Sequence, residues 1–141
     1  MNANLEKFLK MAKVTTTQNI EVRENFIMYK NGDSGFYPLA KIYDKYIEVL
    51  WLEMNDIEMD LYVRRNQYGE YDWLARVPFE NLNETEFEIY AKDLRDKILT
   101  NYKMAKAVSA ARNEFWKTYN AVMDSKWKRT SFDSWNDEKR L

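Results

Sequence analysis

Apolar and polar side chains alternate along residues 20–78, whereas from residue 84 onward the apolar side chains recur every three or four positions. Alternation is the pattern of a half-buried strand, and the wider spacing is that of one face of a helix. The turn-forming residues are confined to the alternating section, because all three glycines and both prolines lie between residues 31 and 78. We therefore predict the α+β class, with a β section followed by a helical section.

Five strands are expected in the alternating section, preceded by a short helix. Residues 3–13 carry apolar side chains at helical spacing, and residues 14–19 connect this helix to the sheet. The sequence Asn31-Gly32-Asp33-Ser34-Gly35 is typical of a hairpin loop, and short turns separate the later strands. The expected strands, joined as an antiparallel meander, are residues 25–30, 36–43, 46–53, 57–65 and 71–78.

One register for this meander satisfies both the apolar and the charged positions. It pairs residue 43 with 46, residue 53 with 57 and residue 65 with 71. Opposite charges then meet across neighbouring strands, which stabilises an antiparallel pair. The three expected charge pairs are Lys41–Glu48, Arg64–Asp72 and Asp60–Arg76. The face expected to pack on a helix carries Phe26, Met28, Ala40, Ile42, Ile47, Val49, Trp51, Met59, Leu61, Val63, Trp73, Ala75 and Val77.

The opposite face of the expected sheet is also rich in large apolar side chains. Open sheet faces usually alternate to polar residues, so this face needs an explanation. Either the first helix or the C-terminal tail covers it, or it is an exposed binding surface. Its acidic neighbours, such as Glu48 and Asp72, would repel phosphate and argue against RNA there. The tyrosines that would form this alternative partner face are Tyr29, Tyr37, Tyr43, Tyr46 and Tyr62.

The helical section begins with a recognisable cap and is unusually long. Asn83 followed by Glu86 is typical of a capping box at a helix start. An unbroken helix over residues 84–124 would span about 60 Å, whereas a compact domain of this size has a radius of gyration of about 14 Å. Two outcomes follow: the helix ends near Thr100–Asn101, where Asn tolerates the left-handed conformation, or it continues and packs on a partner. We favour the break, which would give a helical hairpin.

These elements predict one α+β domain over residues 1–141. It is a five-stranded antiparallel meander, with a short N-terminal helix and a long C-terminal helix or helical hairpin packed on one face. The length of 141 residues fits one domain and leaves little room for a second. The expected parts are an N-terminal helix with its connector (1–19), the sheet (20–78), a helical region (79–124) and an aromatic, basic tail (125–141).

The sequence contains no cysteine and no histidine, which restricts its chemistry. Disulfides, thiolate or imidazole metal sites, and Ser-His or Cys-His catalytic pairs are excluded. The carboxylates Glu53, Asp56, Glu58 and Asp60 cluster near one turn, but they lack the glycine-spaced loop of a calcium site and are read as a solvated strand face. We therefore expect no enzymatic activity, no metal and no cofactor.

The sequence carries no pattern of a signal peptide in residues 1–13 and no run of apolar residues long enough to span a membrane. We therefore expect a cytoplasmic protein with no membrane partner.

Charge is distributed unevenly along the helical section. Residues 80–96 carry six carboxylates and two cations, whereas residues 103–130 carry seven cations and two carboxylates. An acidic start and a basic end suit the helix dipole, so this asymmetry has a purely structural explanation. The functional alternative is a basic strip over residues 103–129 that binds phosphates or an acidic protein surface.

The sharpest local feature is a tryptophan flanked by cations, followed by two more aromatic residues in a polar tail. Such a tryptophan serves as an interface anchor or stacks on a base. The alternative is that these aromatic residues fold back onto the body of the domain. The expected partner-binding residues are Arg112, Lys117, Lys126, Trp127, Lys128, Arg129, Phe132 and Trp135.

The function expected from these features is non-enzymatic binding of a macromolecular partner, most naturally a protein. A small, Cys-free, Lys-, Asn- and Tyr-rich chain is typical of phage or mobile-element accessory proteins. One such class inhibits a host defence nuclease, a nucleic-acid-processing enzyme, by occupying its surface inside the host cytoplasm. Two alternatives stay open: a nucleic-acid-binding module that uses the strip 103–129, and a homodimer or larger structural homo-oligomer with the long helix as its seam.

Overall fold

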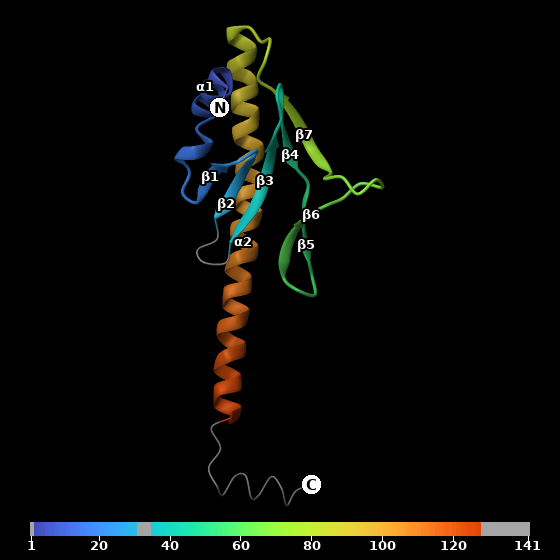
Figure 1. Cartoon of the computed structure of the whole chain (residues 1–141). Helices are drawn as coiled ribbons and strands as arrows, with labels where there is room; N and C mark the ends of the chain where they lie inside the picture. The colour runs from blue at the N-terminus through green and yellow to red at the C-terminus, as the bar shows by residue number, and fades with distance from the viewer. Residues whose placement is uncertain (1, 31–34, 128–141) are drawn as a thin grey trace, which may run out of the picture. The chain divides into compact units, whose positions relative to one another are not determined.

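The computed structural model describes residues 2–30 and 35–127 (Figure 1). The chain divides into two units, Met1–Ser109 and Ala110–Leu141, which are described separately below. The elements in chain order are α1 (Ala3–Ala12), the 3-10 turn η1 (Val14–Thr16), β1 (Ile20–Arg23), β2 (Phe26–Lys30), β3 (Phe36–Ile42), β4 (Tyr46–Leu50), β5 (Leu52–Asn55), β6 (Asp60–Val63), β7 (Trp73–Pro78) and α2 (Glu84–Trp127).

The first unit contains a five-stranded antiparallel sheet, a short N-terminal helix and the first part of a long C-terminal helix, so the α+β prediction is confirmed. The strand order is β1-β2-β3-β4-β7, and β5 and β6 form a separate hairpin inserted between β4 and β7. One strand prediction was wrong and one strand was missed. The segment expected as a strand at residues 57–65 contributes only to the hairpin. The segment 20–23, placed in the sheet section but in none of its expected strands, is the edge strand β1.

The expected register is found between β3 and β4, before the inserted hairpin, and between Arg64 and Asp72, after it. It is not found between β5 and β6. Lys41 lies opposite Glu48 as predicted, and the Arg64 guanidinium lies 3.4 Å from the Asp72 carboxylate. The turn expected at residues 54–56 falls instead at residues 56–59, because the side chain of Asn55 accepts hydrogen bonds from two backbone N–H groups of that turn. The expected pair Asp60–Arg76 does not form, because Arg76 lies opposite Glu48.

A bulge in β3 changes which residues of β2 face the core. Ile27 pairs with Ala40 and Met28 pairs with Pro38, so Leu39 is the extra residue of the bulge. Ile27 and Tyr29 therefore share the helix-covered face with Ala40, and not the opposite face as expected. Proline inside a strand segment is typical of a bulge, because its ring nitrogen cannot donate to the ladder.

The core lies between this sheet face and two helices, α1 and the first half of α2, which lie side by side in Figure 1. Phe8 of α1 is fully buried, and its ring lies 5.1 Å from Phe87 of α2 and 5.9 Å from Phe79. Arg95 of α2 donates hydrogen bonds to the carbonyl oxygens of Ala12 and Lys13. Carbonyl groups at the end of a helix have no N–H partner within the helix. Apolar packing and two hydrogen bonds at the end of α1 thus fix both helices on one face of the sheet.

The long helix begins as predicted and does not break where a break was favoured. The backbone N–H of Asn83 donates to the Glu86 carboxylate, and the N–H of Glu86 donates to the Asn83 side chain, which is a complete capping box. Asn101 lies within the continuous helix and is 1 % exposed. Its amide donates to the carbonyl oxygens of Leu39 (3.1 Å) and Leu50 (3.0 Å). Asn101 therefore joins the helix to the sheet and does not end it.

Candidate partner-binding surfaces

The sheet face that lies away from α2 carries a row of one aromatic and three charged side chains. Phe26, Lys41, Glu48 and Arg76 are successive cross-strand partners from β2 to β7. The Lys41 ammonium lies 5.9 Å from the ring centre of Phe26, and the Arg76 Nε lies 2.9 Å from the Glu48 carboxylate. Glu48 is only 3 % exposed, so this row contains a buried carboxylate paired with a half-exposed guanidinium.

A tight turn reaches across this face. Asn66 holds the turn by accepting hydrogen bonds from the N–H groups of Tyr68 and Glu70. The ring of Tyr71, which precedes β7, lies 6.5 Å from Phe26 of β2. Three strand spacings separate β2 from β7, about 14 Å, so the segment must arch over the sheet to make this contact. This arch helps to explain why Glu48 is buried.

Burial and the neighbouring carboxylate change the acidity of a tyrosine at this face. Tyr43 stacks on Tyr46 at 4.9 Å between ring centres. Burial, followed by the charge of Glu48 and a hydrogen bond with it, raises the pKa of Tyr43 to about 12. A hydrogen bond from Arg76 to the Glu48 carboxylate raises the pKa of the guanidinium further. Both shifts keep these groups in the protonation state that the pairing requires.

A hollow of about 530 Å³ remains between this face and the arching turn. Its cations already have partners within the chain. Arg65 lies 4.3 Å from the ring centre of Tyr71, and Arg76 lies 4.4 Å from that of Trp73. These cation–π contacts and the Glu48–Arg76 ion pair hold the two guanidinium groups against other side chains of the face. The cluster thus serves to hold the strands and the turn together.

The second unit has a different surface, a set of large apolar side chains that are exposed on α2. Phe115, Trp116 and Tyr119 contact one another, with ring centres 5.4 to 6.1 Å apart. These three side chains are 45 to 47 % exposed, and Val122 is 59 % exposed. We call Phe115, Trp116, Tyr119 and Val122 the α2 stripe. Four large apolar side chains clustered on one exposed helical segment are typical of an interaction surface.

The α2 stripe continues the spacing of the buried positions of the same helix. Buried residues of α2 fall at steps of four and three from Phe87 to Ala105, and the same steps lead on through Arg112 to Val122. This is a heptad repeat, whose apolar positions pack on a neighbouring element. The positions in order are Phe87, Ala91, Leu94, Ile98, Asn101, Ala105, Val108, Arg112, Phe115, Tyr119 and Val122.

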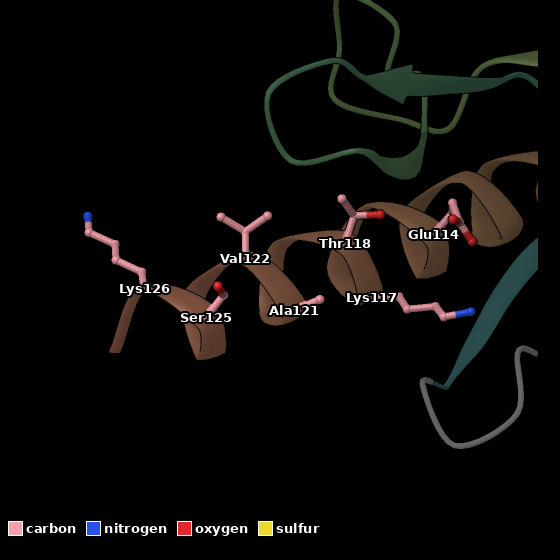
Figure 2. Close-up of a pocket in the computed structure, with 7 residues that line it drawn as sticks. All are labelled: Glu114, Lys117, Thr118, Ala121, Val122, Ser125 and Lys126. Carbon is pink, nitrogen blue, oxygen red and sulfur yellow. The ribbon is translucent and has the colours of Figure 1, made fainter. Parts of the chain in front are cut away.

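A shallow hollow of about 660 Å³ runs along one flank of the α2 stripe (Figure 2). It exists because the side chains of Thr118, Ala121 and Ser125 are small, while Lys117 and Lys126 extend at its margins. One helix alone lines it, so it is an open surface groove. Small side chains beside an apolar stripe allow a second element to approach the helix closely.

The five tyrosines expected to share a face are distributed over three places. Tyr29 is 4 % exposed and packs on Tyr37 and on Tyr102 of α2, on the helix-covered side. The hydroxyl of Tyr37 donates to Asp60, 2.6 Å away. The stacked pair described above lies at the opposite face, and Tyr62 lies in the β5–β6 hairpin, where its hydroxyl donates to Glu53. They do not form one surface.

The predicted partner-binding residues fall into two groups. Arg112 is half-buried, and Lys117 and Lys126 are exposed on α2. Trp127 is the last helical residue, and its side chain lies outside the described part of the chain. Lys128, Arg129, Phe132 and Trp135 also lie outside the described residues. The long helix was expected either to break or to pack on a partner, but these four side chains were not predicted as a partner-binding surface. The heptad spacing beyond residue 109 is the signal that identifies the α2 stripe.

The expected basic strip of α2 is split between two sides of the helix. At 100° per residue, Lys103, Lys106 and Lys117 fall within one narrow sector. Arg112 and Lys126 fall on the other side, at the two ends of the α2 stripe. The described cations therefore do not form one continuous line for a phosphate backbone.

Within residues 2–30 and 35–127, no group of three or more carboxylates is placed to hold a metal ion. In the same part of the chain, no helix combines the length and apolar character needed to cross a membrane. No family model, no curated protein and no solved structure matches this chain.

Proposed function

We propose that this chain is a non-enzymatic binding protein that holds a protein partner through the α2 stripe. The observation that carries the proposal is the exposed cluster of Phe115, Trp116 and Tyr119 at heptad spacing. Tryptophan and tyrosine dominate the residues that contribute most to binding at protein interfaces. No comparably uncovered aromatic cluster lies among the described residues of the first unit, where the aromatic rings of the sheet are paired with cations or with one another.

The composition of the exposed segment supports this proposal. Most of the stability of helices in proteins comes from the packing of an apolar face and less from the intrinsic preference of the residues. Residues 110–127 include two asparagines, a threonine, a valine and several aromatic residues, all of which are weaker helix formers than alanine. A helix of this composition is stabilised by packing its apolar face on another surface, and the α2 stripe supplies that face.

Charge favours a protein over a nucleic acid as the partner. A nucleic-acid module would line up its cations along the phosphate backbone. Here the described cations divide between two sides of α2, and the aromatic side carries only Arg112 and Lys126. The finer suggestion of a phage or mobile-element inhibitor of a defence nuclease rests on composition alone, and in that case the nuclease would be the protein held by the α2 stripe.

The proposal is tested by affinity capture with the tagged full-length chain, from cells that encode it and co-express an untagged copy. Three baits are compared: the wild type, Phe115→Ser/Tyr119→Ser, and a control with Asn113→Ser/Asn120→Ser. The asparagines are exposed on the same segment and project from the outer side of the helix. Nuclease treatment of a parallel sample removes proteins captured through nucleic acid.

We expect at least one nuclease-resistant protein, including the untagged copy as a candidate, to be captured by the wild type and the control and lost with the stripe variant. If the stripe variant captures the same proteins in the same amounts as the wild type, the proposal is wrong. Capture that disappears on nuclease treatment would instead support the nucleic-acid alternative.

A further inference from the structure

We propose that the α2 stripe is covered by the α2 stripe of a second copy of this chain, with the two helices antiparallel. This inference rests on the proposed function, because it names the partner of the same surface. The heptad spacing through residue 122 is the pattern by which helices pair side by side. A second copy brings a stripe with the same spacing, so one symmetric contact covers the exposed aromatic rings of both chains.

The positions of the two stripe cations select the orientation. In a parallel pair in register, Arg112 would face Arg112 of the other copy, and Lys126 would face Lys126. Like charges directly opposed in a helical seam are unfavourable. In the antiparallel pair that sets Phe115 against Tyr119, Arg112 lies opposite Val122 and the two arginines are separated. The long arginine side chain can then cover the valine and keep its guanidinium in water.

The flank of the α2 stripe fits close approach by a helix. The groove seen in Figure 2 borders the α2 stripe at the small side chains of Thr118 and Ser125. Its far side is lined by Ala121 together with the charged Glu114 and Lys117. Trp116 of the α2 stripe lies beside the heptad positions that form the seam, and it carries no charge. The other residues that flank these positions are also uncharged, namely Ala111, Thr118, Met123 and Ser125. Glu114, Lys117 and Asp124 lie on the outer side instead. Between Arg112 and Lys126 the seam and its borders are therefore apolar or small, which is what a helix pair requires.

The first experiment measures the mass of the purified full-length chain by light scattering and sedimentation from micromolar to near-millimolar concentration. We expect a reversible monomer–dimer equilibrium. Phe115→Ser/Tyr119→Ser should weaken dimerisation at least a hundredfold, whereas Asn113→Ser/Asn120→Ser should change it less than threefold. Both substituted pairs are exposed, so the urea midpoint of the first unit, followed by exchange of its core amides, should stay unchanged and show that each variant folds.

The second experiment tests orientation and uses the absence of cysteine from the chain. Arg112→Cys and Val122→Cys are made separately, mixed in reduced form, equilibrated and oxidised. The antiparallel pair brings residue 112 of one copy against residue 122 of the other, so the mixed disulfide should exceed both homodisulfides at least tenfold. A parallel pair would give the two homodisulfides, because cysteines more than about 7 Å apart between Cα atoms cannot be bridged.

The outcomes separate this inference from the proposed function. A wild-type chain that stays monomeric at every concentration overturns the second copy as the partner, and stripe-dependent capture of another protein would then leave the proposed function standing. A dimer that is insensitive to Phe115→Ser/Tyr119→Ser overturns the stripe as its seam. Predominant homodisulfides overturn the antiparallel arrangement.

Discussion

One buried polar side chain connects α2 to the sheet of the first unit. Asn101 lies in α2 and donates both of its amide hydrogens to carbonyl oxygens of the sheet. One of these carbonyls belongs to Leu39 at the bulge of β3, and the other belongs to Leu50 at the end of β4. Regular ladder pairing is interrupted at both places, so the asparagine supplies hydrogen bonds where a strand cannot. The same residue type that suggested a helix end in the sequence is here the link between helix and sheet.

Replacing Asn101 should therefore destabilise the protein strongly. Asn101→Leu keeps the volume but removes two donors, and each carbonyl left without its partner costs about 1–3 kcal/mol. We expect the free energy of unfolding to fall by about 2–4 kcal/mol in urea titration. Asn120→Leu, an exposed position on the same helix, is the matched control and should change stability by less than about 0.5 kcal/mol. Equal effects at the two positions would contradict the role given to the Asn101 amide.

Ionisation of Tyr43 should lower the free energy of unfolding at alkaline pH. Its pKa is raised from 10.0 to about 12 in the folded protein, first by burial and then by Glu48. Because the folded pKa lies above the unfolded one, the stabilising contribution is complete below pH 10 and is lost as the pH rises toward about 12. We expect Tyr43→Phe to flatten the fall in unfolding free energy over this interval.

The measurement is urea unfolding of the wild type and Tyr43→Phe at several alkaline pH values, with a reference at pH 8, where any packing change is recorded separately. Parallel curves for the two proteins between pH 10 and 12 would show that Tyr43 does not ionise as described.

At the scale of elements, the sequence predicts what local rules determine and misses what depends on contacts between distant segments. The capping box at Asn83 and the Lys41–Glu48 pair follow from residues close in sequence or joined by a two-residue turn. The pairing of β7 with β4 could not be predicted so directly, because the β5–β6 hairpin is inserted between them. The turn after Asn55 depends on one side-chain oxygen that accepts two backbone hydrogens, a signal no alternation of apolar residues contains.

The candidate surfaces were likewise predictable only in part from the sequence. The heptad steps that lead to Phe115 and Tyr119 are present in the sequence, but only exposure distinguishes an uncovered stripe from a buried one. The opposite orientation of Ile27 and Tyr29 depends on the bulge at Leu39, for which Pro38 was the available signal. A proline within an expected strand is a local sign of such a bulge, because its ring nitrogen cannot donate to the ladder.

The pairing of β4 with β7 makes a quantitative prediction about Arg76. Arg76→Ala leaves the Glu48 carboxylate, 3 % exposed, without its guanidinium. We expect a loss of about 2–4 kcal/mol at neutral pH, because a buried charge without its partner is strongly unfavourable. In a double-mutant cycle with Glu48→Gln, the coupling should be about 1.5–3 kcal/mol, as for hydrogen bonds to charged groups.

The comparison cycle uses Asp60, the residue that sequence reasoning alone placed opposite Arg76. Asp60 accepts a hydrogen bond from Tyr37 in the structure, so Asp60→Asn and Arg76→Ala should be additive within about 0.5 kcal/mol. Strong coupling of Arg76 to Asp60 and weak coupling to Glu48 would show that the register of β7 is wrong.

At the scale of the whole molecule, one helix serves two units with different sources of stability. The heptad positions from Phe87 to Ala105 are buried against the sheet and α1, whereas residues of the α2 stripe are about half exposed. Local opening is easiest where few apolar contacts protect the backbone hydrogen bonds. The two parts of α2 should therefore open with different free energies, and only the second should respond to a partner.

Amide hydrogen exchange at two protein concentrations tests this difference. Amides of residues 112–126 should exchange rapidly in dilute solution and slow at least tenfold when the chain is concentrated enough to associate. Amides of residues 91–105 should keep the same protection at both concentrations. Phe115→Ser/Tyr119→Ser should abolish the concentration dependence and leave residues 91–105 unaffected. Protection of residues 112–126 that is high and independent of concentration would mean that the segment needs no partner.

The heptad positions of α2 also predict which substitutions should occur together among natural variants of this chain. The side chains of Leu94 and Ile98 pack in the chain's own core, so a substitution there must fit the local packing. The side chains of Phe115 and Tyr119 would pack on a partner, so a substitution there can be compensated by a change in another molecule. If that molecule is a second copy, each mutation appears on both sides of the contact at once and must be compatible with itself. Among natural variants, positions before Ser109 should then change with residues of the sheet, while Arg112 and Val122 should change together.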